Sequence, residues 1–486
     1  MKNEKRLKIL VVASEMAPYA KSGGLGDVVG TMPNAVAQLG VDMRVVVPKY
    51  RSIDTKYFAG IRYLGDFPVT LNWRHQKAGV LEKKVDDLTV YFLENDYYFG
   101  RDGYYGYEDD AERFAFFDKA VLEMLRFLDF YPDIIHCNDW QTGPLCMMLR
   151  EAFWGFTDYK SIRTVYTVHN LQYQGRFPMQ VMEFFDVPYE KFYQCEFYGQ
   201  VNYMKAGLVY ADEITTVSPT YAKEVQTFQY GYGLEGVLQS RKDHLQGILN
   251  GIDFAHNDPA TDPRLVVNYG ITTLEKKKEN KFALQKQLGL PQRDCPMMAV
   301  ISRLADQKGL VLISWALPQL LNEDVQFVVL GTGEQRYEDY FRKMEWEHRD
   351  KVSANIIFDD TLAQRIYASA DLFLMPSLFE PCGLGQMFAL RYGAVPVVRK
   401  TGGLSDTVTH FNPETGEGNG FVFEHYTGDG LLWAVWQGLN LFWNDHLAWE
   451  KIMKNGMSCD FSWHQAAKAY LTMYENLVGE TNAKRG

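Results

Sequence analysis

The chain alternates between short, continuously apolar runs and longer segments in which apolar residues recur every three or four positions. The short runs are typical of buried parallel strands, and the longer segments are typical of the helices that cover them. We therefore expect an α/β protein with parallel sheets between layers of helices. The expected strands are residues 7–13, 43–48, 134–137, 164–168 and 213–217 in the first half, and 297–301, 326–330, 356–358, 372–376 and 394–398 in the second.

The two halves meet in a segment that has neither periodicity. Residues 250–253 read NGID, and residues 254–264 are rich in Pro, Asn and Asp, which is typical of a linker between domains. A chain of 486 residues is also too long for one hydrophobic core. We expect an N-terminal domain over residues 1–253 and a C-terminal domain over 254–463. The last helical segment, residues 464–486, is expected to pack back on the N-terminal domain.

A short internal repeat indicates that the two halves are similar. The sequence GGLGD at residues 23–27 is echoed by GGLSD at residues 402–406, and each copy precedes a helical pattern. The alternative is that both are ordinary glycine-containing turns between a strand and a helix.

Composition and charge narrow the class of protein. Hydrophobic residues make up 47% and charged residues 23%, as in an ordinary globular enzyme. The net charge of −11 disfavours nucleic acid as a partner. No apolar stretch is long enough to span a bilayer, so no membrane association is expected. The six cysteines are scattered without a C-x-x-C pair, which predicts reduced thiols in a cytoplasmic protein and no structural metal.

Three loops that follow expected strands carry groups suited to an anion. Residues 14–27 contain Lys21 before a glycine pair, and residues 302–309 contain Arg303 and Lys308. Ligands of open α/β sheets bind outside the carboxyl ends of the strands, where fixed cations can stabilise a departing diphosphate. The alternative for Arg303 and Lys308 is a pair of solvated surface cations.

The third loop, residues 376–386, places Glu380 in a turn ahead of a glycine-containing helix start. Amides at residues 383–385 could hold a phosphate, and Glu380 could accept hydrogen bonds from sugar hydroxyls. We expect this turn to be partly exposed. A glutamate before a proline is otherwise an unremarkable surface feature.

A set of short motifs runs through these and other segments. They are KSGGLGD at residues 21–27, HCNDW at 136–140, VHNLQYQG at 168–175, SPTYAKE at 218–224, NGID at 250–253, SRLADQKG at 302–309, FEPCGL at 379–384, RKTGGL at 399–404 and FSW at 461–463. Together they resemble the motifs of the bacterial glycogen synthases and plant starch synthases, glycosyltransferase family 5. The likeness covers essentially the whole chain in order.

The resemblance implies a GT-B architecture, in which two Rossmann-like domains face each other across a deep interdomain cleft. It implies transfer of glucose from ADP-glucose to the non-reducing 4-hydroxyl of glycogen or another α-1,4-glucan, with retention of configuration. The family uses a front-side path in which the leaving phosphate helps to deprotonate the acceptor. No metal, pyridoxal phosphate or other cofactor is implied.

The resemblance also assigns roles to particular residues. Arg303 and Lys308 match the pair that grips the pyrophosphate, and Glu380 matches the residue that holds the donor glucose. His169 matches the histidine at the glucose 6-hydroxyl, and Asp139 matches an aspartate near the reacting sugars. The implied donor-binding residues are Lys21, Gly23, Gly24, Asn250, Phe358 (stacked on the adenine), Cys382, Gly383, Leu384, Gly385, Thr401, Gly402 and Gly403.

The acceptor is assigned to a ring-rich loop. Residues Tyr97, Phe99, Arg101 and Tyr104 match the family's Y-F-x-R-x-G-x-Y stretch and could stack against glucose units. The alternative is a loop whose rings pack on their own domain.

Some positions depart from the family pattern. Gln141 stands where many members have histidine, Leu378 where arginine is frequent, and Gly385 where threonine or asparagine is common. We expect altered donor affinity rather than inactivity. The alternatives are a UDP-glucose-dependent or oligosaccharide-forming transferase of the same fold, and a catalytically silent glucan-binding protein. The sequence does not indicate the oligomeric state.

Overall fold

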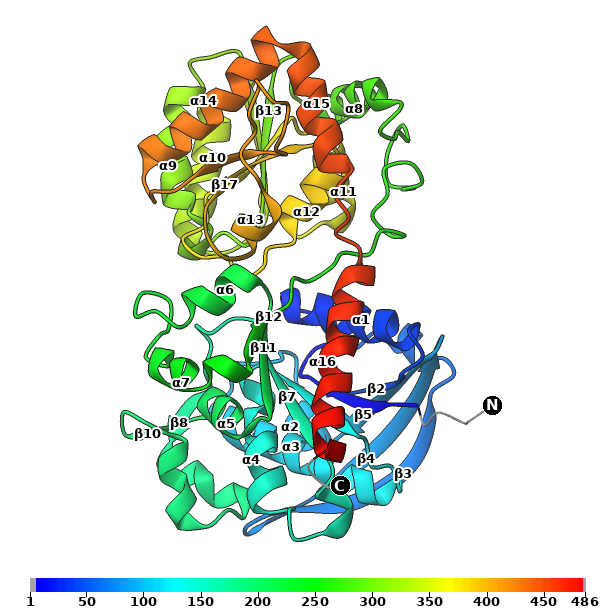
Figure 1. The fold of residues 1–486 in the computed structure, drawn as a ribbon. Helices are drawn as coiled ribbons and strands as arrows, with labels where there is room; N and C mark the ends of the chain where they lie inside the picture. The colour runs from blue at the N-terminus through cyan, green and yellow to red at the C-terminus, as the bar shows by residue number, and fades with distance from the viewer. Residues whose placement is uncertain (1–5, 484–486) are drawn as a thin grey trace. The chain divides into compact units, whose positions relative to one another are not determined.

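The computed structural model describes residues 6–483, which form two compact units (Figure 1). Unit 1 contains Met1–Gly251 and Trp463–Gly486, and unit 2 contains Ile252–Ser462. The division after Gly251 falls two residues before the expected one.

Unit 1 is built on a nine-stranded sheet in the order β12-β11-β7-β6-β1-β2-β5-β4-β3. The strands from β12 to β5 are parallel, and β4 and β3 extend the sheet in antiparallel fashion. The strands are β1 Lys8–Val12, β2 Asp42–Pro48, β3 Arg62–Leu71, β4 Arg74–Val85, β5 Leu88–Glu94, β6 Ile134–Asn138, β7 Arg163–Val168, β11 Glu213–Thr216 and β12 Leu245–Gly247. A small separate sheet holds β8 Arg176–Pro178, β9 Glu196–Phe197 and β10 Gln200–Asn202.

Helices complete unit 1. They are α1 Gly24–Ala37, α2 Asp96–Phe99, α3 Asp110–Phe127, α4 Gly143–Glu151, α5 Tyr203–Tyr210, α6 Pro219–Glu224, α7 Glu235–Ser240 and α16 Trp463–Ala483. Residues 9–12 of β1 are fully buried, as expected for a central parallel strand that is covered on both faces.

Unit 2 has a six-stranded parallel sheet in the order β15-β14-β13-β16-β17-β18. Its strands are β13 Met297–Ile301, β14 Gln326–Leu330, β15 Val352–Asn355, β16 Leu372–Met375, β17 Val395–Arg399 and β18 Phe421–Phe423. Its helices are α8 Lys277–Gln287, α9 Leu310–Leu320, α10 Gln335–Glu347, α11 Asp360–Ser369, α12 Gly385–Arg391, α13 Gly402–Thr407, α14 Gly428–Asn444 and α15 His446–Met457.

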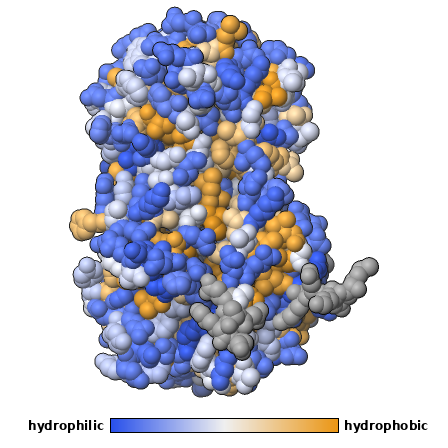
Figure 2. Space-filling model, viewed as in Figure 1, coloured by the Kyte–Doolittle hydropathy of each residue, from blue (hydrophilic) through white to orange (hydrophobic). Residues whose placement is uncertain are grey.

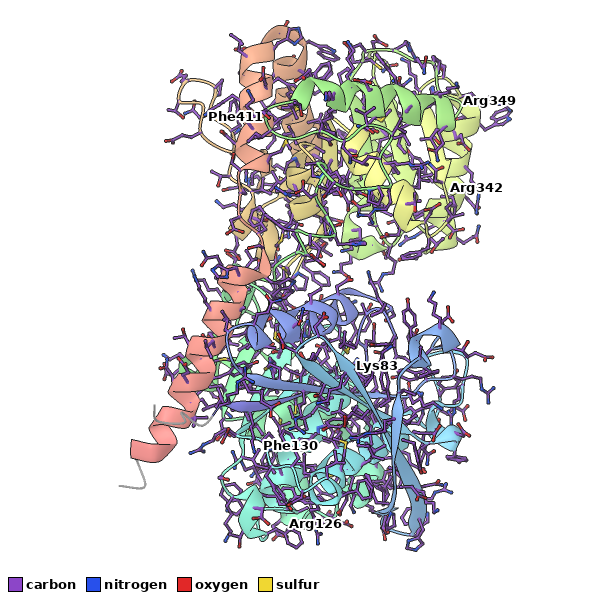
Figure 3. The ribbon with its side chains drawn as sticks, turned by 90° about the vertical axis from the view of Figure 1, so that its right-hand side faces the viewer. Lys83, Arg126, Phe130, Arg342, Arg349 and Phe411 are labelled. Carbon is purple, nitrogen blue, oxygen red and sulfur yellow. The ribbon has the colours of Figure 1, made fainter. Side chains whose placement is uncertain are left out.

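Helix α10 illustrates how the outer helices are oriented. It buries Tyr337, Phe341 and Met344, which recur at the spacing of one helical face. On its exposed side, Arg342 forms an ion pair with Glu338 at 3.1 Å and projects outward (Figure 3).

On the face shown in Figure 2, hydrophilic residues predominate and apolar residues form separate patches. None of the described helices is long and apolar enough to cross a membrane.

Both units are wound in the same way. In each, the first strand is central, the next strands extend the sheet on one side, and the later strands extend it on the other. The direction of winding therefore reverses between β1 and β6 in unit 1 and between β13 and β16 in unit 2. Such switch points form crevices at the carboxyl ends of the strands, and ligands bind there. The expected α/β class with two Rossmann-like halves is confirmed.

All but one of the expected strands are present. The exception is residues 356–358, because the strand lies earlier, at Val352–Asn355, where it pairs with β14. Residues Ile357 and Phe358 are exposed, and Asp359 begins α11 by accepting a hydrogen bond from the Leu362 amide. The apolar run at residues 356–358 therefore does not form a strand, and the strand is the preceding segment Val352–Asn355.

The hairpin formed by β3 and β4 was not expected. Phe67, Val69 and Leu71 alternate with more exposed residues along β3, which is a strand signal. Pro68 argues against a central strand, yet β3 is the edge strand of the sheet, where proline is tolerated. Asn72 adopts φ 51° in the turn between the strands.

The last helix, α16, packs against α1 within unit 1 (Figures 1 and 3). Its Tyr474 hydroxyl lies 2.6 Å from Nδ1 of His136 on β6, and both side chains are fully buried. This polar contact ties the end of the chain to the centre of the sheet.

Candidate functional site

A cavity of about 190 Å³ opens in unit 2 at the carboxyl ends of β13 and β16, the switch point of the sheet. The lining includes the ends of both strands and the loops that follow them. Among the residues predicted to act on the donor, it brings together Arg303, Lys308, Glu380, Gly383, Leu384 and Gly385. These residues come from two segments of the chain that meet only because β13 and β16 are neighbours.

The centre of the cavity wall is an ion pair. Lys308 Nζ lies 2.7 Å from Glu380 Oε2, and the Ser377 hydroxyl donates a hydrogen bond of 3.0 Å to the same oxygen. Glu380 is only 5% exposed, so the expectation of a partly exposed carboxylate was wrong. Its burial follows from the loop after β16, which folds back over the strand ends.

The loop after β13 holds its cations by a tight turn. Lys308 ends the 3-10 turn Asp306–Lys308, and Gly309 follows with φ 70°. A Cβ at Gly309 would lie 1.9 Å from the Pro376 carbonyl oxygen, so only glycine fits. Arg303, at the other end of the loop, donates to Gln307 Oε1 at 3.4 Å. Two cations beside a glycine-containing turn suit a ligand with two phosphate groups.

Several predicted donor residues of unit 2 do not line this cavity. Gly402 and Gly403 are buried against the Glu380 turn, where the Gly403 amide donates to the Glu380 carbonyl at 3.1 Å. A Cβ at Gly403 would lie 2.0 Å from the Cys382 carbonyl oxygen. These glycines therefore let the α13 segment support the turn. In the described part of unit 2, Phe358, Cys382 and Thr401 are also absent from the cavity lining. The Phe358 ring is 86% exposed.

The candidate residues of unit 1 follow the carboxyl ends of its parallel strands. Lys21, Gly23 and Gly24 lie after β1, Asp139 after β6 and His169 after β7. Asn250 follows β12 and is buried. The residues of unit 1 that the sequence motifs identified therefore all lie at the carboxyl ends of the strands of this sheet.

The loop after β1 is held by a residue that sequence reasoning missed. Glu15 is buried and accepts hydrogen bonds of 2.6 Å from the hydroxyls of Ser22 and Tyr105. Lys21 projects from this loop and pairs with Asp27 at 2.7 Å. The available signal was a carboxylate in the loop that follows a buried strand.

Asp139 has a strained backbone, with φ 57° and ψ −177°. This region is populated almost only by glycine, and other residues occupy it at functional sites at a cost of about 1–3 kcal/mol. Asp139 Oδ1 accepts a 2.7 Å hydrogen bond from the His169 amide, which joins the ends of β6 and β7. Burial raises the pKa of this carboxyl to about 7.

His169 is held in turn by Asn138, a second residue that the sequence analysis missed. His169 Nε2 lies 2.9 Å from Asn138 Oδ1. Burial lowers the pKa of the His169 imidazole to about 3, so the ring is neutral near pH 7. A neutral imidazole can accept a hydrogen bond from a sugar hydroxyl.

The ring-rich loop is divided between surface and core. Tyr97 is half exposed, and Arg101 forms an ion pair with Asp109 at 2.6 Å. Phe99, by contrast, is fully buried and packs edge-on against Tyr50 at 5.8 Å. The expectation that Phe99 contacts the acceptor is therefore wrong, because its ring belongs to the core of unit 1.

The Tyr104 ring also packs on Tyr50, with 4.8 Å between the ring centroids, and is partly buried.

Among the residues that the structure describes, no group of three or more potential metal ligands is present. Asp109 and Asp110, two adjacent carboxylates at the start of α3, form ion pairs with Arg101 and Arg113, respectively.

Each of the two units matches a known protein family. Residues 8–240 match the family described as starch synthase catalytic domain, and residues 281–440 match glycosyl transferases group 1. The chain is 49% identical to a glycogen synthase of Moorella thermoacetica over 484 residues, which are 99% of this chain and 98% of that protein. It is 48% identical to a glycogen synthase of Clostridium novyi over 477 residues, 97% of this chain and 99% of that protein.

Solved structures agree with these matches. The catalytic domain of starch synthase IV from Arabidopsis thaliana, bound to ADP and acarbose, superposes with a TM-score of 0.91 at 35% identity. That match covers 98% of this chain and 100% of the Arabidopsis chain. Sucrose-phosphate synthase from Thermosynechococcus elongatus, at 17% identity and a TM-score of 0.63, shares the fold alone. The chain therefore belongs to the glycogen synthase and starch synthase family, whose GT-B enzymes transfer glucose from a nucleotide sugar to a glucan.

Proposed function

We propose that the donor of this glucosyltransferase is ADP-glucose and that glucose is added to the non-reducing 4-hydroxyl of an α-1,4-glucan with retention of configuration. The observation that carries the proposal is the cavity of unit 2, where Arg303, Lys308 and Glu380 meet at the switch point of the sheet. The ADP found in the Arabidopsis starch synthase structure supports adenine as the base.

The side chains of the cavity suggest how the leaving group is stabilised. As the bond from the sugar to the diphosphate breaks, negative charge grows on the phosphate oxygen. Arg303 and Lys308 are fixed cations that would stabilise this charge more in the transition state than in the ground state. Glu380 would accept hydrogen bonds from the donor sugar once the diphosphate replaces it as the partner of Lys308.

Residues of unit 1 are proposed to supply further contacts to the donor and to the acceptor. His169 would accept a hydrogen bond from the glucose 6-hydroxyl, and Lys21 would add a further cation for the diphosphate. Asp139 would lie near the reacting sugars. Tyr97, Arg101 and Tyr104 remain the proposed acceptor contacts. Asn250 and Gly24 are proposed donor contacts, as is the exposed ring of Phe358 for the adenine. We propose that the chemistry needs neither a metal nor another cofactor, and that the enzyme acts in the cytoplasm.

The donor is tested by incubating the purified enzyme with glycogen and either ADP-[14C]glucose or UDP-[14C]glucose, and counting the precipitated glucan. We expect incorporation chiefly from ADP-glucose. Preference for UDP-glucose would overturn the donor assignment, and no incorporation from either would favour a silent glucan-binding protein. Proton NMR of the first product formed establishes whether the new linkage is α.

The cavity assignment is tested with two lysine variants. Lys308→Ala should lower the turnover number by about 100-fold or more, the scale seen when a group that stabilises transition-state charge is removed. Lys343→Ala is the control, because Lys343 is exposed on α10 and its one ion pair within residues 6–483 is with Glu347, at 3.7 Å. Near-normal turnover by Lys308→Ala would show that this lysine does not stabilise the leaving group.

A further inference from the structure

The side-chain amide of Asn138 has one permitted orientation. Asn138, the last residue of β6, is 1% exposed. Its Nδ2 donates to the carbonyl oxygens of Val12 at 3.1 Å and of His136 at 3.2 Å. If the amide were flipped, Oδ1 would face two carbonyl oxygens that can only accept hydrogen bonds. The two carbonyls therefore decide which end of the amide points away from them.

This orientation determines where the proton of His169 lies. Asn138 Oδ1 faces His169 Nε2 at 2.9 Å, and an amide oxygen only accepts, so Nε2 must carry the hydrogen. Since burial keeps the ring neutral, it has one nitrogen-bound proton. Nδ1 is then the unprotonated nitrogen, and within residues 6–483 no protein group forms a hydrogen bond with it.

The neighbouring histidine shows that such control is specific. His136 contacts the Tyr474 hydroxyl through Nδ1 and the Thr167 hydroxyl through Nε2, both at 2.6 Å. Hydroxyls donate or accept as needed, so these partners permit either tautomer of His136. Of these two buried histidines, His169 is the one that faces a partner able to accept but not to donate.

We propose that Asn138 is a positioning residue that holds His169 as the Nε2–H tautomer, so that Nδ1 accepts a hydrogen bond from a hydroxyl of the substrate. The identity of that hydroxyl rests on the proposed function, which places His169 at the glucose 6-hydroxyl. The hydroxyl must therefore be the hydrogen-bond donor and Nδ1 the acceptor. A group that accepts but cannot donate, such as fluorine, should not replace it.

The tautomer is measured directly by nitrogen-15 NMR of the full-length wild-type protein with labelled histidine. The His169 signals are identified by their loss in His169→Gln. We expect a protonated Nε2 and an unprotonated Nδ1 near neutral pH. An Nδ1–H tautomer or a doubly protonated ring would overturn the proposal, whatever donor the enzyme uses.

Asn138→Asp preserves the side-chain shape but places a carboxylate beside Nε2. We expect this change to favour a doubly protonated His169, whose Nδ1 donates instead of accepting, and to lower kcat/KM by about tenfold or more. The same NMR experiment shows whether the protonation change accompanies the loss. If activity fell while the His169 signals kept the wild-type tautomer in a folded protein, the positioning role would be refuted. The wild-type measurement stands even if this variant does not fold.

The direction of the hydrogen bond is tested with a nucleotide-glucose donor that carries fluorine in place of the 6-hydroxyl. The wild type should use it about tenfold less efficiently than the parent donor, a difference of about 1.4 kcal/mol. In His169→Ala, the two donors should become nearly equivalent. An unchanged ratio in His169→Ala would overturn the proposed contact. Failure of the proposed function would instead appear as no transfer from the parent donor.

Discussion

Lys308 Nζ and Glu380 Oε2 lie 2.7 Å apart, so the cation proposed to bind the leaving diphosphate is held by the carboxylate proposed to bind the sugar. The two groups sit on loops that are 72 residues apart in the chain. A diphosphate that enters the cavity would compete with Glu380 for Lys308. In the proposed function, the pair would hold the two loops together until the donor binds.

The first prediction separates the stability of this pair from its catalytic role. Lys308→Ala should lower the free energy of unfolding by about 1–3 kcal/mol, because it leaves a buried carboxylate without its cation. The value should fall below that of a fully buried pair, since the Lys308 side chain is 21% exposed. The double variant Lys308→Ala/Glu380→Gln should recover part of the stability but none of the turnover. Urea unfolding and initial rates measure the two effects, and wild-type stability of Lys308→Ala would show that the pair contributes nothing to folding.

The second prediction concerns the pH dependence of stability at Asp139. Its pKa is raised from 3.8 to about 7 in the folded protein, so the folded state favours the protonated carboxyl. The resulting stabilisation is present at low pH and is lost as the pH rises from about 4 to about 7, at up to about 1.4 kcal/mol per pH unit. Asp139→Asn cannot ionise, so it should be more stable than the wild type at pH 8, and this advantage should shrink toward pH 4. Its transfer activity should nevertheless fall.

Urea unfolding at several pH values tests this prediction. Asp129→Asn is the control, because Asp129 also has a positive φ, 48°, but is exposed. That variant should show the pH dependence of the wild type. If Asp139→Asn also did so, ionisation of Asp139 would have no part in the stability profile.

The sequence predicted the loops of the site better than the state of their side chains. The alternation of apolar runs and helical segments located β13 and β16, and the rule that ligands bind at strand ends then selected Arg303, Lys308 and Glu380. Periodicity reports only local environment, however. The burial of Glu380 and its bond to Lys308 depend on strand order, which no local pattern specifies.

The same limit explains the residues that were missed. Asn138 stands inside a recognised motif, but its orientation is set by the Val12 carbonyl, 126 positions earlier. Residues 356–358 were chosen as a strand for their apolar character, whereas pairing with β14 selected Val352–Asn355. Tertiary contacts decided each of these outcomes.

The third prediction tests the connection between α16 and β6. Tyr474→Phe removes the hydroxyl that contacts His136 Nδ1 and leaves a buried nitrogen without a partner, which should cost about 1–3 kcal/mol of stability. Tyr166→Phe is the matched control, because within the described residues the buried Tyr166 hydroxyl has no hydrogen-bond partner. Thermal unfolding should show a lower midpoint for Tyr474→Phe and an unchanged or higher one for Tyr166→Phe. Equal midpoints would mean that the contact does not stabilise unit 1.

The fourth prediction distinguishes the glycines that could face a ligand from those that support the fold. A Cβ at Gly24, the first residue of α1, would meet no atom within 4 Å. Gly24→Ala should therefore keep or raise the stability, by up to about 1 kcal/mol, because alanine favours the helix. A higher KM for the donor in this stable variant would indicate that the ligand approaches the backbone there.

Gly403→Ala should behave in the opposite way, because its Cβ would lie 2.0 Å from the Cys382 carbonyl oxygen. The turn that carries Glu380 would have to move, so both stability and turnover should fall together. Urea unfolding and donor-saturation kinetics on the two variants make the comparison. A Gly24→Ala enzyme with unchanged KM would remove Gly24 from the donor site. A Gly403→Ala enzyme as stable as the wild type would contradict the supporting role of this glycine, since a clash with a backbone carbonyl cannot be relieved by rotating a side chain.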